Sequence, residues 1–155
     1  MIPVFCPELI VAETIAHLKA AGSDGRECLV FWLARRLEDR MNVVNAHRPQ
    51  QQARRHRFFV PPTEMASLRA LLRNERLMIA AQIHSHPEEA FHSIADDEGA
   101  FIRHQGALSF VLPRFARDSS VSTFLADAAL FELQANNQWM PVPFADITAR
   151  CHIQC

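Results

Sequence analysis

The clearest chemical pattern in the sequence is HSHP at residues 84–87, which Ser93 and Asp96 follow. If the apolar residues before it form a β-strand, His84 and His86 share one face, with Cα atoms roughly 6.6–7 Å apart, so both imidazoles can reach one metal ion. The proline ends the strand, and the serine suits the start of a helix that returns the aspartate to the same ion. Two histidines and one carboxylate leave a fourth tetrahedral position open for water, which is typical of catalytic zinc.

Two less specific interpretations concern the same residue types. An HxH pair alone is usually a pair of polar surface histidines, but the proline and the SxxD spacing that follow favour the metal site. The terminal segment Cys151-His152-x-x-Cys155 has the residue types of a zinc knuckle, but three residues separate its cysteines. We therefore interpret that segment as a frayed tail.

At these residues the chain resembles the JAB/MPN/Mov34 family in its metal-binding JAMM form. The family pattern combines an upstream glutamate with HxHP and SxxD, and Glu27, His84, His86, Ser93 and Asp96 match it. The local sequences HSHPEEAFHS and GALSFVLPRFA are similar to a bacterial branch. The resemblance spans most of the chain and implies a single domain over residues 1–155. Its expected fold is a three-layer α-β-α MPN domain with a mixed, largely antiparallel sheet, like that of cytidine deaminases.

The register of the aspartate departs from the common family pattern by one residue. Six residues, 87–92, separate His86 from Ser93, one fewer than usual. Strict counting from the second histidine would make Asp97 the ligand. We prefer Asp96, because a deletion in a loop costs little, whereas a serine cap and an aspartate one turn later are fixed to each other by helix geometry. Asp97 remains the alternative, and as a neighbour it would suit the positive end of the helix dipole.

The resemblance also implies roles for Glu27 and Ser93. The family's glutamate binds the metal's water rather than the metal, so Glu27 would act as general base and then protonate the leaving amine. Ser93 would donate a hydrogen bond to the oxyanion that forms on the scissile carbonyl. Glu27 opens the apolar segment ECLVFWL, where an acid needs a partner, although a strand-end surface glutamate is the simpler interpretation. Glu38 is the competing acid, but it lies in a turn. Ser85 receives no role.

The surrounding sequence predicts the elements that position these residues. Apolar periodicity and turn residues imply a layered α/β domain with a mixed sheet. The expected helices span 7–22, 63–74 and 94–104, with Thr63 and Ser93 as caps. The expected strands span 27–35, 41–46, 58–60, 77–83, 108–112, 129–134 and 138–142, with 77–83 at the centre of the sheet. We interpret the basic stretch 47–57 as an inserted loop.

Composition limits the classes of function. The chain has 155 residues, 49% of them hydrophobic, which is enough for one domain with a sizeable core. Sixteen basic and seventeen acidic residues argue against a general nucleic-acid binder. We expect neither a membrane span nor a signal peptide, because no apolar run is long enough. The four cysteines then indicate reduced thiols and the cytosol.

The resemblance implies a zinc-dependent isopeptidase or peptidase that hydrolyses the bond after the C-terminal tail of a ubiquitin-like modifier. Expected partners are that modifier or its conjugate, and activating-like and conjugating-like enzymes of the same operon, in some bacteria for antiviral defence. One alternative is a metal-free MPN scaffold that binds another MPN domain. The other is a JAB hydrolase that acts on a small amide or a sulfur-carrier protein.

Overall fold

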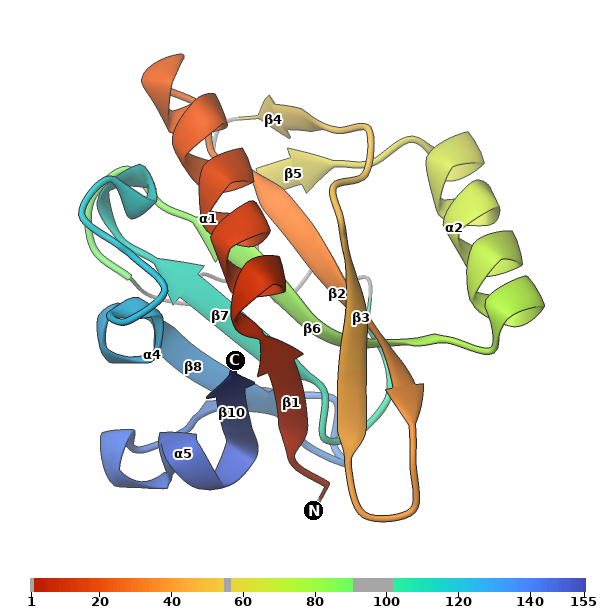
Figure 1. The fold of residues 1–155 in the computed structure, drawn as a ribbon. Helices are drawn as coiled ribbons and strands as arrows, with labels where there is room; N and C mark the ends of the chain where they lie inside the picture. Colours follow the sequence, from red (N-terminus) through yellow and green to blue (C-terminus); the bar gives the residue numbers. More distant parts are fainter. Residues whose placement is uncertain (1, 55–56, 91–101) are drawn as a thin grey trace.

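The computed structural model describes residues 2–54, 57–90 and 102–155, and its main sheet has eight strands in the order β10-β1-β3-β2-β6-β7-β8-β9 (Figure 1). The strands of the chain are β1 (Val4–Pro7), β2 (Leu29–Arg36), β3 (Met41–His47), β4 (Gln52–Arg54), β5 (Arg57–Phe59), β6 (Met78–Ser85), β7 (Leu108–Leu112), β8 (Ala129–Leu133), β9 (Trp139–Pro141) and β10 (Cys151–Gln154). The helices are α1 (Glu8–Ser23), α2 (Pro62–Glu75), α4 (Phe124–Asp127) and α5 (Ile147–Arg150), with short 3-10 helices η1 (Arg114–Ala116) and η2 (Phe144–Asp146).

The main sheet is mixed. The pairings β10–β1, β1–β3 and β6–β7 are parallel. The pairings β2–β3, β2–β6, β7–β8 and β8–β9 are antiparallel. Strands β2 and β6 lie in the middle of the sheet, so the expectation of a central strand before HSHP is confirmed.

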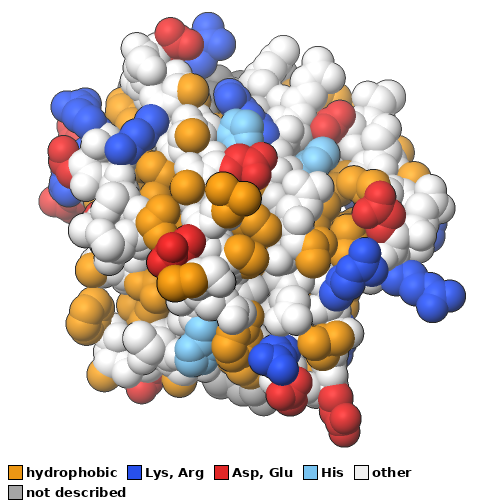
Figure 2. Space-filling view, in the orientation of Figure 1, with side chains coloured by type: hydrophobic (Ala, Val, Ile, Leu, Met, Phe, Trp, Pro, Cys, Tyr) orange, Lys and Arg blue, Asp and Glu red, His pale blue; other side chains and the backbone are white. Residues whose placement is uncertain are grey.

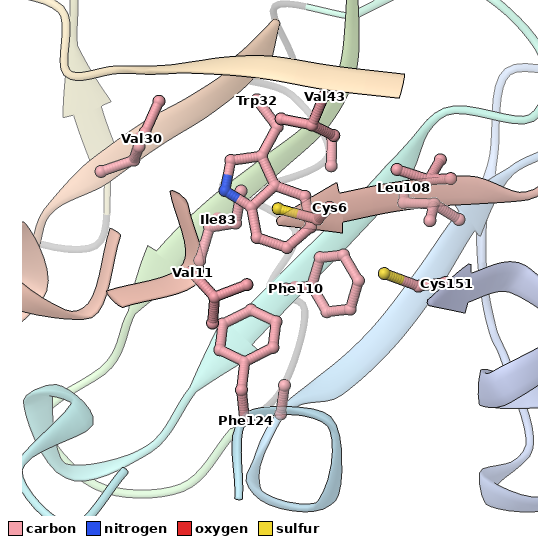
Figure 3. Packing of buried hydrophobic residues seen from close by; sticks show 14 of the residues in the cluster. Cys6, Val11, Val30, Trp32, Val43, Ile83, Leu108, Phe110, Phe124 and Cys151 are labelled. Carbon is pink, nitrogen blue, oxygen red and sulfur yellow. The ribbon is translucent and has the colours of Figure 1, made fainter. Parts of the chain in front are cut away.

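Two hydrophobic cores, one on each face of the sheet, make the three expected layers. On one face, Val11 and Leu18 of α1 pack with Trp32 and Phe110, whose rings lie 5.3 Å apart (Figure 3). On the other face, Leu68 of α2 belongs to a second cluster with alternate residues of β2, namely Leu29, Phe31 and Leu33. Because β2 is buried on both faces, its sequence is an unbroken apolar run rather than an alternating one.

The C-terminal segment corrects the expectation of a frayed tail. Cys151–Gln154 forms β10, which pairs in parallel with β1 in the register Val4↔Cys151. The guanidinium of Arg150 anchors this segment, because its Nε lies 2.8 Å from Oε2 of Glu132 and both side chains are buried. Sequence analysis missed both β1 and β10, since each has only four residues.

Three further expectations were wrong in part. The basic stretch 47–57 is not one loop, because it contains β4 and the start of the β5 strand that pairs with it. Thr63 does not cap α2: Pro61 holds the N-cap position and a proline follows at the first helical position, where its missing N–H costs nothing. The expected helix 94–104 does not reach His104, since residues 102–104 are not helical; its remainder and its cap Ser93 lie outside the described residues.

None of the helices described for this chain is both long and apolar enough to cross a membrane. On the face shown in Figure 2, basic and acidic side chains are interspersed with apolar ones rather than gathered into one basic surface.

Candidate metal centre

Strand β6 places His84 and His86 together at its carboxyl end. His84 is 2% exposed and lies between Leu29 of β2 and Val111 of β7 in the sheet register. His86 is 5% exposed and follows the last strand residue. The two ring centroids are 5.2 Å apart, with an angle of 80° between the ring planes. The strand therefore brings both predicted ligands to one point, side by side and sheltered from solvent.

This pair of imidazoles fits one zinc ion. Two imidazoles that bind a tetrahedral ion through nitrogens about 2.0–2.1 Å from it have ring centroids about 5 Å apart, which is the separation found here. Neutral imidazole is among the commonest zinc ligands, and burial in an apolar sheet excludes competing water. The donor chemistry and the spacing of His84 and His86 both suit this metal.

The structure places Glu27 next to the histidines, two residues ahead of β2. Leu29 is paired with His84 in an antiparallel register, so continuing this register by two residues brings Glu27 across from His86. Alternation along the strands then puts the glutamate on the same face as both histidines. Glu27 is half-buried and lines an open cavity, which suits a group that must reach both a buried centre and a substrate.

Ser85 has a structural function that sequence analysis missed. Its hydroxyl accepts a hydrogen bond from the N–H of Cys28 at 3.1 Å, and its own N–H donates to the Cys28 carbonyl at 3.2 Å. Both residues are fully buried. Ser85 therefore joins the HSHP strand to the residue that follows Glu27. The alternation of the strand predicts that its side chain faces away from the histidines, but the partner of the hydroxyl required the structure.

A second contact fixes the other side of the Glu27 segment. The carboxamide of Gln51 accepts a hydrogen bond from the Leu29 N–H at 2.7 Å and donates one to the Leu29 carbonyl at 2.8 Å. These are the bonds that the main chain of a neighbouring strand would make. The Gln51 side chain thus continues the pairing along β2 beyond the last β2–β3 residue pair, Phe31↔His47. A glutamine within the run Gln50–Gln52 gives no sequence signal for this role.

The cavity beside Glu27 has a volume of about 540 Å³ and a mostly polar lining. It lies between the end of α1 and the segment that follows β3. Its lining comprises Ala20, Ala21, Asp24, Arg26, Glu27, Arg48, Gln51 and Gln52. Of the predicted site residues, Glu27 is the one that lines this cavity.

The remaining predicted site residues, Ser93, Asp96 and the alternative Asp97, lie outside the described residues. Within the ranges 2–54, 57–90 and 102–155, no three histidine, cysteine, aspartate or glutamate side chains gather as a metal-binding group. The third ligand is therefore still a prediction from the SxxD spacing.

The competing acid Glu38 lies at the opposite end of the sheet. Glu38 follows β2 in a bend, beyond Ala34, which pairs with Met78 at the start of β6. Met78 and His84 are six residues apart along β6. At about 3.3 Å per residue, this is a distance of about 20 Å. Two other histidines have local structural contacts: His47 is 3.6 Å from Glu64, and the ring of His152 stacks on Phe5.

The cysteines near the sheet core are free thiols, as expected. Burial raises the pKa of Cys28 to about 11, partly offset by the nearby guanidinium of Arg48. Burial also raises the pKa of Cys151 to about 12, again offset in part by its neighbour Arg150. Cys28 belongs to the core cluster on the α1 face of the sheet, opposite the face that the histidines share with Leu29, so it does not compete for an ion held by the histidines.

Comparisons with known proteins support this fold and identify relatives in sequence. A probable metalloprotease of Sinorhizobium fredii is 33% identical over 149 residues, which cover 94% of this chain and 90% of that protein. A protein of Desulfitobacterium hafniense, solved in solution, has the same fold with a TM-score of 0.67 at 16% identity, covering 97% of this chain and 92% of that one. A protein of Salinibacter ruber, also solved in solution, gives a TM-score of 0.55 at 16% identity, with 88% of each chain covered.

The family model described as prokaryotic homologs of the JAB domain matches residues 7–118, a range that contains Glu27, the HSHP strand and the SxxD segment. The chain is therefore a member of the prokaryotic JAB family.

Proposed function

We propose that this protein is a zinc-dependent peptidase of the JAMM type. The observation that carries the proposal is the pair of buried imidazoles 5.2 Å apart, with Glu27 two residues ahead of the neighbouring strand in a register that puts it across from His86. Membership of the JAB family and a relative named as a probable metalloprotease support a general peptidase role. His84 and His86 would hold the zinc, together with Asp96 or, in the alternative register, Asp97.

The proposed reaction gives each of the chain's own residues one step. A zinc ion at this centre supplies Lewis-acid activation of water and of the scissile carbonyl. Glu27 accepts a proton from the attacking water and delivers it to the leaving amine. Ser93 donates a hydrogen bond to the oxygen of the tetrahedral intermediate. Burial of the two histidines keeps this chemistry in surroundings where charge stabilisation is strong.

We further propose that the substrate is the C-terminal tail of a ubiquitin-like protein, cleaved from a lysine or from a C-terminal extension. The open cavity of about 540 Å³ beside Glu27 supports this substrate class, since part of an extended tail would have room there next to the proposed general base. Activating-like and conjugating-like enzymes of the same operon would be functional partners. Free cysteines among the described residues support the cytosol as its compartment.

The test compares cleavage with metal content. We expect purified protein with about one zinc per chain to cleave a ubiquitin-like fusion after its C-terminal tail. Glu27→Gln should slow cleavage by about 10²–10⁴-fold while zinc is retained, because it removes only the proton acceptor. Asp96→Ala should lose zinc, and Asp97→Ala should keep most of it; the reverse result would move the ligand to Asp97.

The same assay separates the alternatives. Cleavage of small amides or of a sulfur-carrier fusion, without cleavage of ubiquitin-like fusions, would replace the proposed substrate but keep the zinc chemistry. Zinc-free wild-type protein that binds another MPN domain would instead identify a scaffold.

A further inference from the structure

Three consecutive residues after β7 have a left-handed backbone. Arg114, Phe115 and Ala116 have φ values of 50°, 54° and 57°, and none of them is glycine. The other described non-glycine residues with positive φ, Arg76 and Asn137, are isolated. A left-handed run brings each Cβ close to the following carbonyl oxygen, so it persists only where its surroundings hold it in place. The contacts of this turn therefore need a specific explanation.

The backbone of the turn binds the chain at His86 and two residues after it, at Glu88. The N–H of Phe115 donates to the carbonyl of His86 at 2.8 Å, and the N–H of Arg114 donates to the carbonyl of Glu88 at 2.9 Å. The N–H of His86 in turn donates to the carbonyl of Leu112 at 2.9 Å. The regular β6–β7 pairing ends at Ser85↔Leu112, so these bonds continue to hold the chain where the strand has stopped.

Helix α1 supports the other side of the turn, at Gly22. A Cβ atom on Gly22 would lie 2.4 Å from Cβ and 3.0 Å from Cγ of Phe115, and 3.3 Å from its carbonyl oxygen. Rotation about the Cα–Cβ bond can move Cγ, but Cβ cannot move without the backbone, so the contact at 2.4 Å can be relieved only by a shift of the main chain. Gly22 does not have a positive φ, so the glycine is required for space and not for conformation. On the same turn, Ala116 is fully buried.

We propose that Gly22 and Phe115 are positioning residues for the metal centre. The close contact of Phe115 with Gly22 holds the left-handed turn, and the turn holds the main chain of His86 so that its imidazole stays beside that of His84. This inference rests on the proposed function, because it assigns a role toward the zinc that the two histidines would bind. It links α1, which carries no predicted ligand, to the geometry of the site.

The first test uses Gly22→Ala. The added methyl group displaces Phe115 and with it the bond to the His86 carbonyl, so we expect zinc affinity, measured by competition with a chelator, to fall about 10–100-fold. In zinc-free protein, the amide hydrogens of His86 and Phe115 should exchange faster than in the wild type. Val43→Ala, a core substitution on β3, is the control: it also lowers stability but should change neither the zinc affinity nor these two amides.

The second test uses Phe115→Gly, alone and combined with Gly22→Ala. Phe115→Gly removes the side chain in contact with Gly22 while glycine tolerates the φ of 54°, so it should also weaken zinc binding. In the double variant the clashing Cβ is absent. Its loss in affinity should therefore be smaller than the two single losses combined, which is the non-additivity expected for residues in contact.

Unchanged zinc affinity and unchanged amide exchange in Gly22→Ala would overturn the proposal. If that variant does not fold, Phe115→Gly decides: wild-type affinity and exchange in it would also overturn the proposal. Additive losses in the double variant would contradict the contact as the cause. Wild-type protein that binds no zinc would refute the proposed function, and in that case the exchange rates of His86 and Phe115 still test whether the turn holds His86.

Discussion

Ser85 and Glu27 illustrate how main-chain contacts arrange the side chains of the centre. The two histidines and the glutamate share a face because of strand alternation and the β2–β6 register. The side chain between the histidines faces the other way, where it holds the chain next to Glu27. The sequence was sufficient to identify the residue types and their spacing. It was not sufficient to assign Ser85 or Gln51, because each acts through a main-chain group distant in sequence.

Replacing Ser85 should affect turnover more than metal binding. Ser85→Ala leaves the buried N–H of Cys28 without the acceptor it has here, at a cost of about 1–3 kcal/mol in unfolding free energy. It also loosens the attachment of Glu27, so we expect kcat to fall about tenfold while zinc content stays near one per chain. Steady-state kinetics and elemental analysis of the same preparation measure both.

Ser109→Ala is the matched control for this substitution. Ser109 is also fully buried, and its hydroxyl accepts a hydrogen bond from Gln82 at 3.1 Å. The Ser109→Ala variant should be less stable than the wild type but should not show the fall in kcat expected for Ser85→Ala. An equal fall in kcat for both variants would mean that Ser85 contributes only to stability.

At the level of elements, long and strongly apolar segments were predictable. Helix α1, strands β2, β6 and β7, and the β8–β9 hairpin lie within a few residues of their expected ranges. Strands β1 and β10 were not predictable, since a four-residue segment has no distinct period and its partner is more than a hundred residues away. Pairing across such a separation depends on tertiary contacts, here the buried ion pair of Arg150 with Glu132.

That ion pair leads to a prediction about the edge of the sheet. Arg150→Met should lower the unfolding free energy by about 3–5 kcal/mol, because it leaves the carboxylate of Glu132 buried without its partner. Arg150→Met combined with Glu132→Leu should recover a large part of this loss, since two apolar side chains replace the pair. Urea unfolding measures both variants. A double variant as unstable as the single one would show that the pair has a function beyond mutual neutralisation.

The molecule as a whole buries three of its thiols, and this sets how its stability depends on pH. Folding raises the pKa of Cys28 to about 11 and of Cys151 to about 12 from an ordinary value of 9.0. The pKa of Cys6 is also raised, mainly because of burial and in addition because of its neighbour Cys151. The folded state thus favours the neutral thiols. The stability that the protein gains from keeping them neutral is fully present below pH 9.

We therefore expect the unfolding free energy to fall as the pH rises from about 9 to about 12, because the unfolded chain ionises its thiols first. Urea titrations at pH 8 and pH 10.5 measure the change. Cys28→Ala should reduce the slope between these values. An identical slope in this variant would contradict the assignment to buried thiols. In the native protein at neutral pH, a thiol reagent should react with the exposed Cys155 before the three buried cysteines.

The most direct test of the central claim is the zinc content of three purified proteins. We predict about one zinc per chain in the wild type and in Glu27→Gln, and little or none in His84→Ala, with a folded circular dichroism spectrum in all three, because His84 lies near the end of its strand. Wild-type protein without zinc after growth in zinc-supplemented medium, or His84→Ala that keeps its zinc, would contradict a metal centre at His84 and His86.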